Sequence, residues 1–184
     1  MDNNRYLIDI AKDAILEEFE AHQIVDRSLL LKKYPALSRK GAVFVTLEKD
    51  KNLRGCVGSL IAHRTLLDDI ISNAKSAAFR DNRFRPLRRD EFDDRNFSVE
   101  ISILSEPKLL RYKDAKDLSK KIRPQIDGVI LKYGRYQATY LPQVWEQLPR
   151  FDYFFTTLCK KAGLNGNCLE MHPEIYLYQV EKIS

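Results

Sequence analysis

The segment FSVEISIL, residues 97–104, constrains the fold more than any other stretch, because apolar and polar side chains alternate through it without a break. Its apolar positions are Phe97, Val99, Ile101 and Ile103. Its polar positions are Ser98, Glu100 and Ser102. A period of two places these two sets on opposite faces of a strand. The chain is therefore expected to contain a sheet with one strongly apolar face.

Two segments have the period of an amphipathic helix instead. The first is residues 4–21, and the second follows Thr65 and carries a stripe of small and aliphatic side chains from Leu67 to Ala78. Thr65 stands three residues before Asp68, a spacing related to the capping box that begins many helices. The small residues of the second stripe would let that helix pack closely against a sheet.

The remaining segments predict mainly hairpins and short helices. Strands are expected at AVFVTLE (42–48), Leu53–Leu60, VILKYG, RYQATYL and EIYLYQVE, short helices at 114–122 and 142–145, and a longer helix at about 152–161. KKYPALSRKG is expected to be a loop, and so is the charged, proline-containing segment 80–95. Helices flanking a mostly antiparallel sheet predict the α+β class. No internal repeat or linker interrupts the 184 residues, so we expect a single domain.

The composition of the chain indicates its cellular compartment but does not identify its function. The net charge of +5 permits an anionic ligand or RNA without requiring either. No apolar run approaches the roughly 18–20 residues that span a bilayer, and the acidic N-terminus lacks the apolar core of a signal peptide. Three cysteines at irregular spacing argue against a disulfide framework and for a reducing compartment. We therefore expect a cytoplasmic protein that does not enter a membrane.

The stretch Arg54-Gly55-Cys56-Val57-Gly58 admits two interpretations. On a strand, Arg54, Cys56 and Gly58 share a face, and a guanidinium beside a thiol favours the nucleophilic thiolate. Gly58 would then leave room for a ligand beside the sulfur. Alternatively, Cys56 is a small buried residue, and the glycines mark a bulge or a close contact with a helix. The residues alone leave both interpretations open.

Four other residues are candidates for a site around Cys56. Glu100 could pair with Arg54 or act as a base if its strand face meets that of Cys56, although a carboxylate there could also point to water. His63 follows the same strand and could reach the thiol as a base, or could be a surface residue. Asp81 and Arg83 lie in a segment whose charges nearly cancel, as is typical of solvated ion pairs.

A metal or nucleotide site is not expected. Cys159, Cys168 and His172 are one ligand short of the closed set of four that a structural zinc needs. No phosphate-binding loop, dinucleotide fingerprint, nucleophile elbow or iron–sulfur spacing is present. The sequence therefore predicts no metal and no cofactor.

Taken together, these segments resemble the AMMECR domain family, known in prokaryotes as AmmeMemoRadiSam system protein A. The family hallmark Leu-Arg-Gly-Cys-Ile-Gly stands here as residues 53–58, with Val57 in place of isoleucine. The likeness continues in order through residues 62–87, 99–107, 127–131, 138–149 and 160–164. Two departures are Asn82, where the family often has proline, and NGNCLEMHPE, where a tryptophan is expected.

The resemblance implies a two-lobed α+β fold in which residues 1–184 form one AMMECR-type domain, with elements from both termini joined in the larger lobe. It also implies association with a Memo-like protein and a radical SAM protein. It implies no established activity.

Three functional hypotheses follow. In the first, the chain is a component of a modification pathway, with Cys56 as nucleophile or carrier, Arg54 as its activator, and Glu100 and His63 as acid and base. In the second, it is a non-catalytic binding module in which Gly55, Gly58, Asp81 and Arg83 line a site for a partner or small anionic ligand and Cys56 is packed. In the third, the basic segment Lys108–Arg123 binds RNA.

Overall fold

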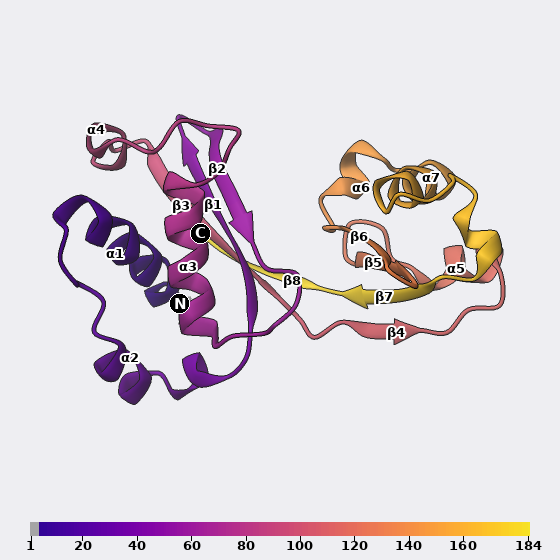
Figure 1. Cartoon of the computed structure of the whole chain (residues 1–184), viewed down its shortest axis with the longest axis horizontal. Helices are drawn as coiled ribbons and strands as arrows, with labels where there is room; N and C mark the ends of the chain where they lie inside the picture. The colour runs from indigo at the N-terminus through magenta and orange to yellow at the C-terminus, as the bar shows by residue number, and fades with distance from the viewer. Residues whose placement is uncertain (1–3) are drawn as a thin grey trace. The chain divides into compact units, whose positions relative to one another are not determined.

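The computed structural model describes residues 4–184 and divides into two compact units. Unit 1 runs to Leu104 and resumes at Glu181–Ser184, whereas unit 2 comprises Ser105–Val180. Unit 2 is therefore inserted between the third and last strands of unit 1 (Figure 1). This α+β arrangement, with antiparallel sheets, flanking helices and two lobes, confirms the predicted fold class.

Unit 1 is built on a four-stranded sheet in the order β2-β1-β3-β8, in which β1 pairs antiparallel with both β2 and β3. Its strands are β1 (Ala42–Lys49), β2 (Asn52–Gly58), β3 (Phe97–Leu104) and β8 (Val180–Ile183). Its helices are α1 (Tyr6–Glu20), α2 (Arg27–Lys33), α3 (Leu66–Phe79) and α4 (Arg89–Phe92), with a 3₁₀ turn at Pro35–Ser38. Helices were predicted at the positions of α1 and α3, and Thr65 caps α3 by accepting from the Asp68 N–H at 3.1 Å.

One face of this sheet is covered by α1 and α3 (Figure 1). Val45 and Leu47 of β1 and Ile101 of β3 are fully buried there, against alanines such as Ala74 of α3. Burying each of the large side chains contributes about 1.5–3 kcal/mol. The small residues of α3 allow the close approach that its sequence predicted.

The opposite face of the same sheet points away from α1 and α3, and we call it the outer face. Thr46 lies directly across from both Cys56 and Glu100, so these three side chains form one row over three strands. Phe44 lies across from Gly58 and Ser102 in the next row. Cys56 and Glu100 are half-buried, whereas Ser102 is buried.

Unit 2 contains a second four-stranded antiparallel sheet, in the order β4-β7-β5-β6. Its strands are β4 (Lys108–Leu110), β5 (Gly128–Tyr133), β6 (Tyr136–Tyr140) and β7 (Glu174–Tyr178). Its helices are α5 (Ala115–Lys121), α6 (Val144–Gln147) and α7 (Phe151–Lys161), with a 3₁₀ turn at Cys168–Met171. Trp145 stacks on Phe154 at a centroid distance of 3.6 Å in its core.

The cysteines correct one prediction from the sequence. Cys159, at the end of α7, forms a disulfide with Cys168, and Cys56 is the free cysteine among the described residues. The odd number of cysteines was wrongly taken as an argument against a disulfide. Three cysteines can form one disulfide and leave one free thiol, as they do here. The inference of a reducing compartment loses this support.

A membrane-spanning element was not expected. Within residues 4–184, no helix is long and apolar enough to cross a bilayer.

Candidate functional site

The hallmark stretch lies on β2, the edge strand of the unit 1 sheet. Leu53 pairs with Glu48 and Gly55 pairs with Leu47, so Arg54 is an extra residue that has no partner on β1. This is a β-bulge, which bends a strand and redirects the side chain that it contains. The alternation from which Arg54 was expected to share a face with Cys56 is therefore interrupted at Arg54.

The guanidinium of Arg54 is held by Glu91, the third residue of α4. Nε and Nη2 donate to the two carboxylate oxygens at 2.8 and 3.0 Å, and Nη2 also donates to the Pro86 carbonyl at 3.3 Å. Such paired, charge-assisted hydrogen bonds are among the stronger contacts in proteins. Arg54 thus fastens the loop before α4 to the edge strand.

Asp81 and Arg83 attach the same loop to the backbone of Cys56. The carboxylate of Asp81 accepts from the Cys56 N–H at 2.9 Å, and Nη2 of Arg83 donates to the Cys56 carbonyl at 3.0 Å. Arg83 also donates to Asp81 through Nε at 2.9 Å and Nη2 at 2.7 Å. The two side chains therefore satisfy the groups that an edge strand leaves unpaired, as a neighbouring strand would.

The opposite charges of Asp81 and Arg83 stabilise their contacts with each other and with Cys56. Hydrogen bonds from Arg83 hold the pKa of Asp81 well below its usual range, against an opposing effect of burial, and the N–H groups of Cys56 and Arg83 add to the lowering. Hydrogen bonding to Asp81 likewise raises the pKa of Arg83, with the nearby Cys56 side chain as a smaller contributor. The guanidinium that contacts Cys56 is thus that of Arg83, through the Cys56 carbonyl oxygen.

The Cys56 thiol lies on the outer face. Oγ1 of Thr46 donates to Sγ at 3.4 Å. Glu100 shares the row but lies on the far side of β1 and pairs with Nζ of Lys182 at 3.3 Å. His63 is exposed in the loop after β2, with Nδ1 at 2.9 Å from the Ile61 carbonyl oxygen.

The two glycines of the stretch lie at close contacts. A Cβ on Gly55 would stand 2.2 Å from the carbonyl oxygen of Ala77 in α3, and one on Gly58 would stand 2.3 Å from Cγ of Phe44. The space beside Gly58 is therefore filled by an aromatic ring. Both glycines allow close packing at the positions that flank Cys56.

The contact between Arg54 and Glu91 makes unit 1 sensitive to acid. Hydrogen bonds from Arg54 lower the pKa of Glu91 from 4.5 to about 2, opposed by partial burial and helped by the Arg88 N–H. A carboxylate with a depressed pKa stabilises the fold above its unfolded pKa and loses that contribution as the pH falls through its folded pKa. We expect the free energy of unfolding to fall between about pH 4.5 and pH 2 partly for this reason.

Glu91→Gln tests this expectation. We expect the variant to lose up to about 1 kcal/mol at pH 7, since the pair is partly solvated, and to show a shallower decline over the acid range. Urea unfolding of both proteins at pH 7, 4 and 3 measures the difference. Parallel pH profiles would show that the pair has no role in acid sensitivity.

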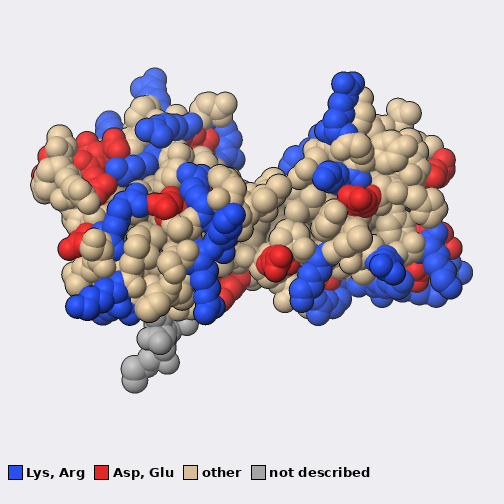
Figure 2. All heavy atoms as spheres, turned by 60° about the horizontal axis from the view of Figure 1, so that its bottom comes forward, with Lys and Arg blue, Asp and Glu red and all other residues tan. Residues whose placement is uncertain are grey.

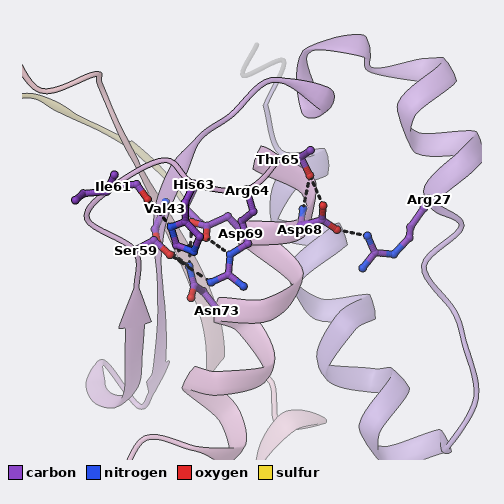
Figure 3. A network of polar contacts seen from close by, with 10 residues as sticks. All are labelled: Arg27, Val43, Ser59, Ile61, His63, Arg64, Thr65, Asp68, Asp69 and Asn73. Carbon is purple, nitrogen blue, oxygen red and sulfur yellow. Dashed lines mark hydrogen bonds and ion pairs between the residues drawn. The ribbon is translucent and has the colours of Figure 1, made fainter.

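A second polar network, which the sequence analysis missed, joins α3 to the end of β2 (Figure 3). The fully buried carboxylate of Asp69 accepts from the Val43 N–H at 2.8 Å, Oγ of Ser59 at 2.6 Å and Nε of Arg64 at 2.7 Å. Nδ2 of Asn73 donates to it at 3.0 Å. The available signal was an Asp and an Asn four residues apart, beside the apolar stripe of α3.

No metal site was predicted. Among residues 4–184, no group of three or more His, Cys, Asp and Glu side chains is placed to hold a metal ion. Cys159 and Cys168 are bonded to each other, which removes two ligands of the incomplete zinc pattern.

Comparisons with known proteins agree with the architecture. A family model described as AMMECR1 matches residues 8–183. Protein SSO0193 of Saccharolobus solfataricus is 39% identical over 176 residues, which cover 89% of this chain and 73% of that protein. A protein of Methanothermobacter thermautotrophicus is 36% identical over 187 residues, covering 98% and 92%. The crystal structure of uncharacterized protein PH0010 from Pyrococcus horikoshii has a TM-score of 0.81 at 30% identity, covering 97% of this chain and 89% of that one.

Proposed function

The chain belongs to the AMMECR1 family, and from this premise we propose that it is a component of a modification pathway in which the Cys56 thiol is the reactive group. Its partners in this proposal are a Memo-like protein and a radical SAM protein. Cys56 would be presented to a substrate or partner on the outer face of unit 1.

One observation carries this proposal. The backbone of Cys56 is held by hydrogen bonds on both its N–H and its carbonyl, yet the residue is not fully buried. Its N–H and carbonyl are both bound by the loop after α3, and the glycines on either side of it are packed against Ala77 and Phe44. Cys56 is nevertheless only half-buried, with its side chain on the outer face. A reactive group fixed by its surroundings needs little reorganisation when a substrate arrives.

The arrangement changes the roles proposed from the sequence. Arg83 replaces Arg54 as the cation proposed to act on the thiol, because Arg83 binds the Cys56 carbonyl directly, whereas the hydrogen bonds of Arg54 go to Glu91 and Pro86. Thr46 is the side chain that contacts the sulfur. Glu100 and His63 would act only through a substrate that reached them.

Alkylation with iodoacetamide, mapped by mass spectrometry on the folded chain, tests the reactivity. The thiolate sulfur bonds to carbon, iodide leaves, and the proton of the thiol goes to solvent. We expect Cys56 to react in the folded protein at pH 7 at least as fast as in the urea-unfolded, unreduced chain. Cys159 and Cys168 serve as internal controls, because their disulfide protects them. A Cys56 that stays unmodified until the protein unfolds would refute the reactive-thiol proposal.

Two variants distinguish the effect of Arg83 on the reactivity of Cys56 from that of Arg54. We expect Arg83→Gln to slow alkylation of Cys56 by about threefold or more, since it removes the cation that binds the Cys56 carbonyl, and Arg54→Gln to change it by less than about twofold. Both variants lose one edge-strand contact, so their urea midpoints show whether a slower rate reflects chemistry or unfolding. The reverse order of rates would restore Arg54 as the activator.

One observation favours a second candidate, a non-catalytic binding module. Arg54, Gly55 and Gly58 all make internal contacts, which is what a purely structural hallmark would show. A Cys56→Ser variant distinguishes the two. Normal stability and partner binding with loss of modification would support the thiol, whereas loss of stability alone would support the module.

A further inference from the structure

The excess positive charge of the chain is concentrated in unit 2. Residues 105–180 contain twelve Lys and Arg against eight Asp and Glu, whereas the rest of the chain has nineteen against eighteen. Most of the charged atoms that show on this unit, at the right of Figure 2, are basic. Of the twelve cations, only Lys121, Arg123 and Arg150 form ion pairs within the described part of the chain. The others are available to an anionic partner.

Four of these cations lie on the hairpin formed by β5 and β6 or at the end of α7, which packs beside it. A two-residue loop, with Gly134 at a φ of +56°, joins the strands and places Lys132 and Arg135 at the tip. The last turn of α7 contributes Lys160 and Lys161.

Two exposed tyrosines lie among these cations. Tyr133 and Tyr136 are directly opposed in the hairpin register and therefore share a face. Their exposed fractions are 41% and 36%, which is high for aromatic side chains. The guanidinium carbon of Arg135 lies 5.3 Å from the ring centroid of Tyr136.

The end of α7 and the loop after it pack against the hairpin. Nζ of Lys161 donates to the Thr139 carbonyl of β6 at 3.0 Å. A Cβ built on Gly163 would lie 3.5 Å from Cδ1 of Tyr136, so this loop is in contact with the hairpin. The Cys159–Cys168 disulfide closes the loop. The surface is therefore a constrained part of unit 2.

We propose that this surface, made of Tyr133, Arg135, Tyr136, Lys160 and Lys161, binds single-stranded nucleic acid. Lys132 pairs with Gln137 in the register, so its side chain lies on the opposite face of the hairpin from the two tyrosines. Cations neutralise backbone phosphates, and exposed aromatic rings stack on unpaired bases, which is how single strands are bound without strict sequence preference. The paired tyrosines favour this partner over an acidic protein, which would need only the charges. The site is separate from the Lys108–Arg123 segment and does not depend on the reactivity of Cys56.

Fluorescence anisotropy of labelled 12-nucleotide RNA and DNA oligomers, mixed with the full chain in 50 mM salt, tests the proposal. We expect Tyr133→Ala combined with Tyr136→Ala to weaken binding by about tenfold or more. Tyr153→Ala is the matched control, since Tyr153 is a 59% exposed tyrosine of the same unit at the other end of α7. We expect it to change affinity by less than about twofold.

A charge variant provides a second test that does not depend on correct folding of the double tyrosine variant. Arg135→Gln combined with Lys160→Gln alters only exposed side chains and should lower the slope of log affinity against log salt by about 1.4, or about 0.7 for each lost phosphate contact. Absence of binding by the unmodified chain, equal losses in the Tyr153 control, or equal competition by polyglutamate and by unlabelled oligonucleotide would each overturn the proposal.

Discussion

Replacing Asp69 by alanine is expected to lower the free energy of unfolding of unit 1 by about 3–5 kcal/mol, because it removes one partner from a buried ionic network. Four donors point at this fully buried carboxylate, from Val43, Ser59, Arg64 and Asn73. Without it, those donors lose their acceptor in a place where water does not replace it. Urea unfolding followed by circular dichroism measures the loss.

The neighbouring residue provides the control. Asp68 has a 38% exposed side chain that pairs with Arg27 and accepts from Thr65 (Figure 3), so Asp68→Ala should lose at most about 1 kcal/mol. Asp69→Asn keeps the shape and removes the charge, and we expect an intermediate loss. Similar losses for Asp68→Ala and Asp69→Ala would mean that burial of the carboxylate has no special role in stability.

The predictions that held were those that depend on local periodicity. FSVEISIL became β3 and the stripe after Thr65 became α3, because each pattern fits one regular element and only one of its faces can be buried. The short helix α2 was missed. Asp26 caps it, because its carboxylate accepts from the Leu29 N–H at 2.9 Å, but the helix has only seven residues and none of them is buried.

The candidate site was harder to predict because its contacts join segments far apart in the sequence. Arg54 is a bulge residue and pairs with Glu91, 37 positions later, and counting the alternation of a strand detects neither feature. Asp81 and Arg83 were chosen as residues of a ligand site, yet their hydrogen bonds go to the backbone of Cys56. That Cys56, Asp81 and Arg83 belong together could be inferred from the sequence only through resemblance to a family.

Gly55 shows how the hallmark stretch depends on α3. It lies on the covered face of β2, opposite Leu47, where the backbone of α3 approaches the strand. The atom that a Cβ would meet at 2.2 Å is the carbonyl oxygen of Ala77, which no change of rotamer can move. Either the helix or the edge strand must shift to accommodate a larger residue.

Gly55→Ala is accordingly expected to destabilise unit 1 by about 3 kcal/mol, at the upper end of the usual effect of overpacking. In a chain of this size that corresponds to a thermal midpoint lower by roughly 6–12 °C. Circular dichroism measures the midpoint, and fluorescence of Trp145, the single tryptophan, reports whether unit 2 keeps its native core at lower temperatures.

Gly134→Ala is the control for Gly55→Ala, because a Cβ there meets nothing within 4 Å and only the left-handed backbone opposes it, at about 1–2 kcal/mol. Ala77→Gly should not rescue Gly55→Ala, since the clash is with a main-chain oxygen. If it did rescue the variant, the Ala77 side chain would be the obstacle. If Gly55→Ala were as stable as the unmodified protein, the strand and helix could separate freely, and Cys56 would not be rigidly held. The same variant thus tests the premise on which the reactive-thiol proposal rests.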